Sequence, residues 1–227
     1  MCDWTLQRKE SSCEFSEQTV QSILRTFRDG FGIPGWSEEG VRRRLMKSDI
    51  ACFLLGVDKT VYGYALYFIP SMPLNGRFLL WENSIALAKN VQGKGFSSQI
   101  LRRVLKAYPE KEFGWVGGRT QNPLIFKHYS ALGGTLFPFD ESYTSEEGRK
   151  LLNYLIQNIP EVSSVDQKDQ LEKDHGICKR IYKEGRLGDY DDRISGTSCF
   201  ERKLKAWGFN RNDGDAVVLI NRLREKV

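Results

Sequence analysis

Ile85-Ala86-Leu87-Ala88-Lys89-Asn90-Val91-Gln92-Gly93-Lys94-Gly95-Phe96-Ser97-Ser98-Gln99-Ile100-Leu101 carries the strongest structural signal in the chain. An apolar strand end runs into a turn with two glycines, and the turn opens directly into a helix. Apolar residues then recur at helical spacing, at Phe96, Ile100, Leu101, Val104, Leu105 and Tyr108. The stretch therefore predicts a strand, a glycine turn and an amphipathic helix in succession.

The start of this helix is suited to an anion. The first N–H groups of a helix have no acceptor within the helix, and the helix dipole places a partial positive charge there. Glycines just before the helix let a ligand approach the backbone closely. The turn therefore indicates a phosphate or diphosphate site, although an ordinary strand-to-helix turn has the same local pattern. It lacks the Gly-x(4)-Gly-Lys-Ser/Thr spacing of a P-loop.

A second pattern lies downstream, in residues 118–134. Asn122 is a favourable N-cap, and Pro123 follows it at the first helical position. Gly133-Gly134 is a strong helix stop. We therefore expect a short helix that carries Tyr129 two turns below its cap, with Ile125 and Leu132 on the same face as Tyr129.

Together the two patterns resemble the GNAT acetyltransferase superfamily. Gln92-x-x-Gly95-x-Ser97 matches the acyl-CoA diphosphate loop of that family, with Ser97 in place of the usual Gly or Ala. Asn122-x(6)-Tyr129, followed by a Leu-Gly stop, matches its second motif. The resemblance covers residues 49–139 well, 16–47 loosely and 215–223 by topology only.

The resemblance implies an α/β fold. This is a mixed, mostly antiparallel sheet with a central, splayed pair of parallel strands, flanked by helices. It also implies acyl transfer, with acetyl-CoA as cosubstrate and default donor, to the primary amine of an unknown small molecule or protein acceptor. The amine would attack the thioester directly in a ternary complex, and no metal is expected.

The family's functional residues can be placed on this chain. The implied cofactor-binding residues are Ile85, Ala86, Leu87, Gln92, Gly93, Lys94, Gly95, Phe96, Ser97, Ser98 and Asn122. Tyr129 is the implied general acid that protonates the leaving thiolate, and a backbone N–H near Leu87 would hold the thioester carbonyl. A lone Tyr129 would otherwise be interpreted as a core aromatic residue.

The general base is less well defined. Many family members carry a carboxylate five residues before the Asn, where this chain has Gly117. Glu82, between Trp81 and Asn83, is the alternative base, because apolar neighbours can raise the pKa of a carboxyl group. An ion-paired or edge-facing carboxylate is the other interpretation of Glu82. The missing carboxylate favours a rival function, an acyl-CoA-binding sensor or interaction protein without catalysis.

Periodicity elsewhere predicts further elements. Helices are expected at 16–28 and from Ser37, the latter with Val41, Leu45 and Met46 facing inward. A β-hairpin is expected from residues 50–57 and 60–69. The remaining expected elements are strands at 78–88, 113–118, 135–139 and 215–223 and helices at 145–158 and 199–207.

These elements suggest a division of the chain. We expect a core at 1–140, an insertion of unknown role with helices at 141–212, and a final core strand and tail at 213–227. The last strand would pair with the strand at 135–139. Acidic residues at 189–192, with Asp140 and Glu141, could line a site for a cationic amine, but a solvated acidic loop is the simpler explanation.

The composition excludes several classes of protein and of binding site. A net charge of +5 over 227 residues suits an anionic cosubstrate but shows no basic stripe for nucleic acid. Five cysteines without a CxxC pair and only two histidines indicate reduced thiols rather than a metal site. Residues 1–10 are polar, and no apolar run is long enough for a membrane span, so we expect a cytoplasmic protein. The oligomeric state is left open.

Overall fold

The computed structural model describes residues 3–8, 15–32, 37–159, 162, 171–172, 174–182, 185–188 and 196–224. The chain divides into two compact units. The first contains Met1–Ile69 and Trp81–Glu110, and the second contains Pro70–Leu80 and Lys111–Val227. The acidic stretch at 189–192, a candidate amine site, lies outside the described residues.

The strands of the first unit pair in the order in which they occur along the chain. They are β1 (Asp3–Arg8), β2 (Ile50–Leu55), β3 (Val61–Phe68) and β4 (Phe78–Leu87). Each pairs with the next in antiparallel orientation. This confirms the predicted hairpin and the mostly antiparallel sheet.

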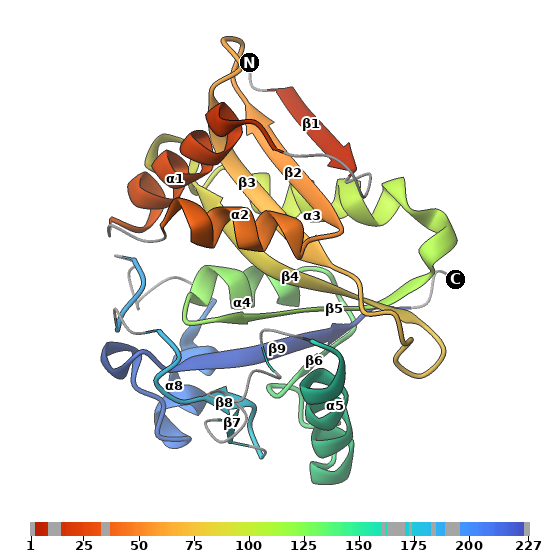
Figure 1. Cartoon of the computed structure of the whole chain (residues 1–227). Helices are drawn as coiled ribbons and strands as arrows, with labels where there is room; N and C mark the ends of the chain where they lie inside the picture. The colour runs from red at the N-terminus through yellow and green to blue at the C-terminus, as the bar shows by residue number, and fades with distance from the viewer. Residues whose placement is uncertain are drawn as a thin grey trace. The chain divides into compact units, whose positions relative to one another are not determined.

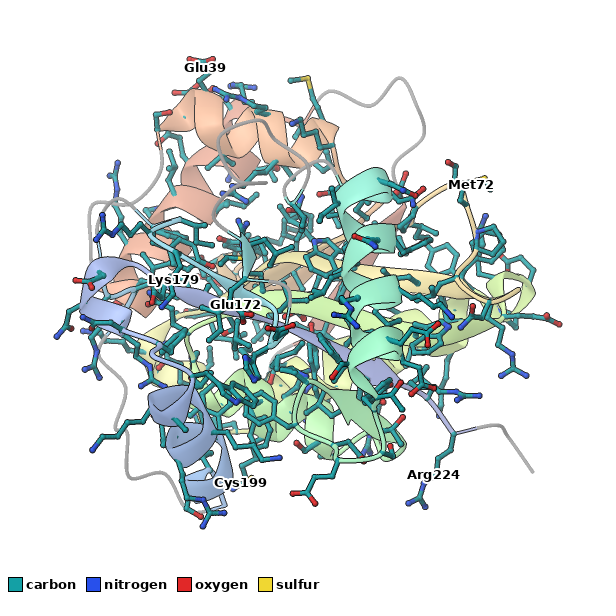
Figure 2. The ribbon with its side chains drawn as sticks, turned by 90° about the horizontal axis from the view of Figure 1, so that it is seen from below. Glu39, Met72, Glu172, Lys179, Cys199 and Arg224 are labelled. Carbon is teal, nitrogen blue, oxygen red and sulfur yellow. The ribbon has the colours of Figure 1, made fainter. Side chains whose placement is uncertain are left out.

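Helices cover both faces of these strands (Figure 1). α1 (Glu17–Phe31) and α2 (Glu38–Met46) begin after the side-chain N-caps Ser16 and Ser37. Their buried residues form one core cluster with the strands, made up of Val20, Ile23, Leu24, Phe27, Val41, Leu45, Ala51, Phe53, Tyr64, Leu66 and Ala86. On the other face, a second cluster joins Leu54 to the start of α3 (Phe96–Ala107).

The second unit is built around its last strand. β5 (Phe113–Thr120) pairs in antiparallel orientation with β9 (Ala216–Arg222). The other edge of β9 is shared by β6 (Thr135–Phe137) and β8 (Ile177–Cys178), and β7 (Leu171–Glu172) pairs with β8. Residues 217–220 have no exposed surface, so β9 lies at the centre of this unit.

Aromatic residues of the predicted insertion pack in the hydrophobic core around α4. α4 (Pro123–Ser130) places Phe126 against Phe200 of α8 (Ser198–Ala206), with ring centroids 4.8 Å apart. Phe139 packs against Phe126 at 4.9 Å and against Trp207 at 5.2 Å. Residues from 198–207 therefore complete the hydrophobic core around α4 rather than standing apart from it.

Most predicted elements are confirmed, and α5 (Ser145–Asn158) has the bounds expected from its periodicity. The pairing of the last strand with β6 is also confirmed. The prediction for Met46 was wrong: its side chain is 65% exposed, because it lies about 100° around α2 from Leu45, which faces the core. The short strands β7 and β8 were not predicted.

α1 and α2 precede β2, β3 and β4, α3 follows β4, and β5 leads into α4. The fold class is accordingly α/β, as predicted, with mostly antiparallel pairing and helices on the faces of the strands.

Candidate functional site

The turn before α3 has open space beside its backbone. Gly95 is the N-cap of α3 in the left-handed conformation (φ 75°), and no side chain caps this helix. Gly93 has a similar φ of 73°, and a Cβ atom added at either glycine would meet nothing within 4 Å. Lys94 in the same turn is exposed. Backbone N–H groups at the helix start, open space and a cation beside them fit a diphosphate.

Side chains hold this turn in place from behind. The Gln92 amide donates to the main-chain oxygen of Leu87 at 2.8 Å and to that of Gly30 at 3.2 Å. The main-chain N–H of Lys89 donates to a carboxylate oxygen of Asp29 at 2.8 Å. Gln92 therefore fixes the turn to the end of β4 and to α1, so its amide nitrogen is engaged within the chain.

The residues of β4 nearest the turn use their side chains for packing. Ala86 is 4% exposed and belongs to the cluster beneath α1 and α2. Leu87 packs on the other face, beside Phe96 of α3. Ile85 is partly buried and lies opposite Ala65. Since the side chains of Ala86 and Leu87 are committed to the two cores, these residues could contact a ligand only through the backbone.

A bulge interrupts β4 just before these residues. Ser84 lies opposite Leu66, but the next pair joins Glu82 to Tyr67, so Asn83 is an extra residue in β4. Leu66 belongs to the core beneath α1 and α2, and strand residues alternate between faces. The bulge therefore moves Glu82 to the face of Tyr67, opposite to the face that strict alternation from Ala86 would give.

Glu82 begins a run of three polar residues in an otherwise apolar strand, and Ser84 of this run faces the core beneath α1 and α2 rather than the face of Glu82. Glu82 is 8% exposed. The hydroxyl groups of Ser84 and Tyr64 lie 3.4 Å apart, and burial raises the pKa of Tyr64, so this phenol stays protonated. Sequence reasoning singled out Glu82 but missed Asn83; the run of three polar residues at 82–84 was the available signal.

In the second unit, the cap of α4 is formed as predicted. The side-chain oxygen of Asn122 accepts from the main-chain N–H of Leu124 at 2.9 Å, and Pro123 follows at the first helical position. The main-chain N–H of Asn122 donates to the Thr120 hydroxyl at 2.8 Å. Asn122 is thus oriented by both β5 and α4.

Tyr129 is completely buried in α4, at 0% exposure. Its ring lies 5.4 Å from the ring of His128, and its main-chain oxygen accepts from the Asn221 side-chain amide at 2.9 Å. A bond from β9 therefore fixes the backbone from which the Tyr129 phenol extends. Gly117, where many GNAT members carry a carboxylate, is likewise buried in β5.

The predicted site residues thus fall into two groups. Residues 82–98 lie in the first unit, where the structure brings together the glycine turn, the end of β4 and its bulge. Asn122 and Tyr129 lie together on α4 in the second unit. Asp140, a weaker candidate, is engaged within the second unit, where its carboxylate accepts from the Ser142 N–H, and this bond lowers the pKa of Asp140.

Among the described residues, no group of three or more His, Cys, Asp or Glu side chains could hold a metal ion. No helix in the described part of the chain is long and apolar enough to cross a bilayer.

Comparison with known proteins gives structural neighbours only. No protein-family model matches the chain, and no curated protein matches it in sequence. The ribosomal-protein-S18-alanine N-acetyltransferase of Escherichia coli is 14% identical over 60% of this chain and 81% of its own, with a TM-score of 0.44. The NatC complex bound to Gag peptide and CoA gives 13% identity, 63% and 92% coverage and a TM-score of 0.46.

A third neighbour is an aminoglycoside acetyltransferase from an uncultured soil metagenomic sample. It is 16% identical over 58% of this chain and 91% of its own, with a TM-score of 0.44. Identities of 13–16% with TM-scores of 0.44–0.46 are too low to transfer a reaction or a substrate to this chain.

Proposed function

We propose that this chain is an N-acyltransferase of the GNAT type, with acyl-CoA as donor, acetyl-CoA as the default donor and a primary amine as acceptor. The observation that carries the proposal is the turn at Gly93–Gly95, where two left-handed glycines leave open space at the uncapped start of α3. A second, independent observation from α4 also supports the proposal. Asn122 caps α4 seven residues before Tyr129, in the pattern of the family's other motif.

In this proposal, different residues bind the diphosphate and the pantetheine arm of the donor. Backbone N–H groups of residues 93–98 hold the diphosphate of the donor, and Lys94 adds a positive charge. Gln92 supports this loop from behind through its bonds to Leu87 and Gly30. The backbone of 85–87 lines the pantetheine arm, and Asn122 helps to fix it.

The chemistry requires the acceptor nitrogen to lose two protons and the sulfur to gain one. Glu82 takes the first proton from the ammonium group of the acceptor, and the free amine nitrogen then attacks the thioester carbonyl carbon. As the carbon–sulfur bond breaks, the Tyr129 hydroxyl donates its proton to the departing sulfur, and the resulting phenolate takes the second proton from the nitrogen of the new amide. A buried carboxylate and a fully buried phenol suit these two roles.

A second candidate function is supported by Gly117. With no carboxylate at that position of β5, the chain could bind acyl-CoA as a sensor or interaction protein without transferring the acyl group. Release of free thiol from acetyl-CoA in the presence of a panel of primary amines separates the two functions. Thiol release above the rate without amine supports transfer, whereas binding without release supports the sensor.

The same proposal extends to the rest of the chain. Residues 141–212 are proposed as an insertion of unknown role in the GNAT core of 1–140, with 213–227 as the final core strand and tail. The proposed compartment is the cytoplasm, where acyl-CoA is available and free thiols such as Cys52 and Cys178 stay reduced.

The deciding experiment is calorimetric titration of CoA into the wild-type protein and into Gly95→Ala. Alanine at φ 75° is strained, and it places a methyl group in the space where the diphosphate would lie. We expect Gly95→Ala to weaken CoA binding by about tenfold or more, which is about 1.4 kcal/mol.

Gly76→Ala is the matched control, because Gly76 has a φ of 78° and also has nothing within 4 Å of an added Cβ atom. It should carry similar strain and leave the CoA affinity unchanged. No heat from CoA with folded wild-type protein would overturn the proposal, as would equal losses in the two variants.

A further inference from the structure

The bulge in β4 leaves one buried side chain without a partner. Both polar atoms of the Asn83 amide are buried, and neither has a hydrogen-bond partner among the described residues. Asn83 as a whole is partly exposed, so the amide end is the part withdrawn from solvent. Most buried amides in folded proteins are paired, because an unpaired one is destabilising. The unpaired Asn83 amide, in the middle of a strand, therefore needs an explanation.

The position of Asn83 points to substrate binding rather than to packing. Bulges often occur beside active sites, where they redirect a side chain. This bulge sets Glu82 and Asn83 together opposite the single residue Tyr67. The hydroxyl groups of Ser84 and Tyr64 lie on the other face of these strands, toward the core beneath α1 and α2. Glu82 and Asn83 are therefore the polar residues that the bulge itself brings together.

We propose that Asn83 binds the acceptor, and that it selects amines carrying a neutral group that both donates and accepts hydrogen bonds, namely an amide or a hydroxyl. This inference rests on the proposed function, since it assigns the acceptor side of the same site. With Glu82 as the group that takes the proton from the amine, the adjacent Asn83 contacts the atoms next to that amine.

The chemistry of the carboxamide defines the class of acceptor. Asn83 offers two N–H donors and one carbonyl acceptor, and all are unsatisfied. An ammonium group in the acceptor could only donate, and a carboxylate could only accept, so each would leave part of the Asn83 amide unpaired. A neutral amide or hydroxyl pairs with both ends. The site therefore disfavours simple polyamines and favours amino amides or amino alcohols, such as a peptide N-terminus or an amino sugar.

The test uses four small primary amines: glycinamide, ethanolamine, ethylenediamine and ethylamine. The near-isosteric Asn83→Leu variant removes the donors and the acceptor but keeps the volume of the side chain. We expect it to lower kcat/KM for glycinamide and ethanolamine by about tenfold or more, to leave ethylamine within about twofold, and to leave the CoA affinity unchanged. Asn153→Leu, at an exposed position of α5, is the control and should change none of these values.

Stability separates this role from a structural one. Replacing an unpaired buried amide with an apolar side chain should keep Tm at or above that of the wild type. A higher Tm together with unchanged selectivity among the four amines would overturn the proposal, as would an equal fall in kcat/KM for all four. The preference between glycinamide and ethanolamine distinguishes a peptide-like acceptor from a sugar-like one.

A direct observation keeps the proposal falsifiable if Asn83→Leu does not fold. In wild-type protein labelled with nitrogen-15, the side-chain amide signal of Asn83 should shift on titration with glycinamide or ethanolamine but not with ethylamine. An unmoved signal overturns the proposal. Because this titration needs no turnover, its failure is distinct from failure of the proposed function, which the calorimetric CoA titration reports.

Discussion

Tyr129 combines complete burial with a proposed chemical role. At 0% exposure, its ring contributes to the core around α4 whatever else the hydroxyl does. The bond from Asn221 to its main-chain oxygen holds the helix backbone against β9, independently of the phenol. Removing only the hydroxyl oxygen therefore separates the acid–base role from the packing role.

We expect Tyr129→Phe to lower kcat by about 10²-fold or more, because a general acid contributes on that scale. The affinity for CoA, measured by calorimetry, should remain within about twofold, since the ring and the helix are kept. Equal losses of kcat and of CoA affinity would show that Tyr129 packs against the cosubstrate rather than protonating the sulfur.

Glu82 illustrates what the sequence could not provide. Its carboxylate was identifiable as the alternative base, but its face of the strand depends on the extra residue Asn83. Alternation counted back from Ala86 would have placed Glu82 on the wrong face. A bulge depends on pairing with a neighbouring strand, and pairing partners are not encoded in local periodicity.

At the level of elements, long periodic segments were predictable and short ones were not. α5 and the cap of α4 have the residues expected, because repeated apolar spacing and N-cap chemistry act locally. β7 and β8 contain two residues each and exist only because Ile177 and Cys178 can pair with β9. The role of Gln92 in holding the turn likewise depends on Gly30, 62 positions away in the chain.

The capping box of α5 gives an element-scale prediction. The Thr144 hydroxyl accepts from the N–H of Glu147 at 3.2 Å, and the Glu147 carboxylate accepts from the N–H of Thr144 at 2.9 Å. We expect Thr144→Ala to lower the free energy of unfolding by about 1 kcal/mol, measured with urea. Thr144→Ser keeps the hydroxyl and should remain close to the wild type.

The same box predicts a dependence on pH. The bonds from Thr144 lower the pKa of Glu147 below its ordinary value of 4.5. A lowered carboxyl pKa stabilises the fold above the unfolded-state pKa, and this contribution is lost as pH falls through the folded-state pKa. The stability difference between wild type and Glu147→Gln should therefore shrink below about pH 4.5. A difference that stays constant down to acid pH would contradict this assignment.

At the scale of the whole chain, a network of polar contacts joins distant segments of the second unit. Arg211 forms a bidentate pair with Glu201 of α8, at 2.8 and 2.6 Å, and donates to the main-chain oxygen of Gln121 at 2.9 Å. The Gln121 side chain accepts from Leu187 at 2.8 Å and donates to Gly185 at 3.2 Å. Segments near residues 121, 186, 201 and 211 are thereby fastened to one another beside the N-cap of α4.

We expect Arg211→Ala to lower the free energy of unfolding by roughly 3 kcal/mol, because it leaves Glu201 partly buried and unpaired. Lys150→Ala is the control, since the Lys150–Glu146 pair is exposed on α5 and its loss should not move the urea midpoint. Similar midpoints for the two variants would show that the Arg211 pair does not contribute to holding these segments together.

The central place of β9 has a consequence for biosynthesis. β5 cannot pair with β9 until that strand, roughly 100 residues later in the chain, has been translated, and β6 and β8 pair with the same strand. During that interval three strand edges stay open to pairing with another nascent chain. The central strand of this unit is therefore synthesised after all the strands that pair with it, and a chain truncated before residue 216 should aggregate rather than fold into a smaller protein.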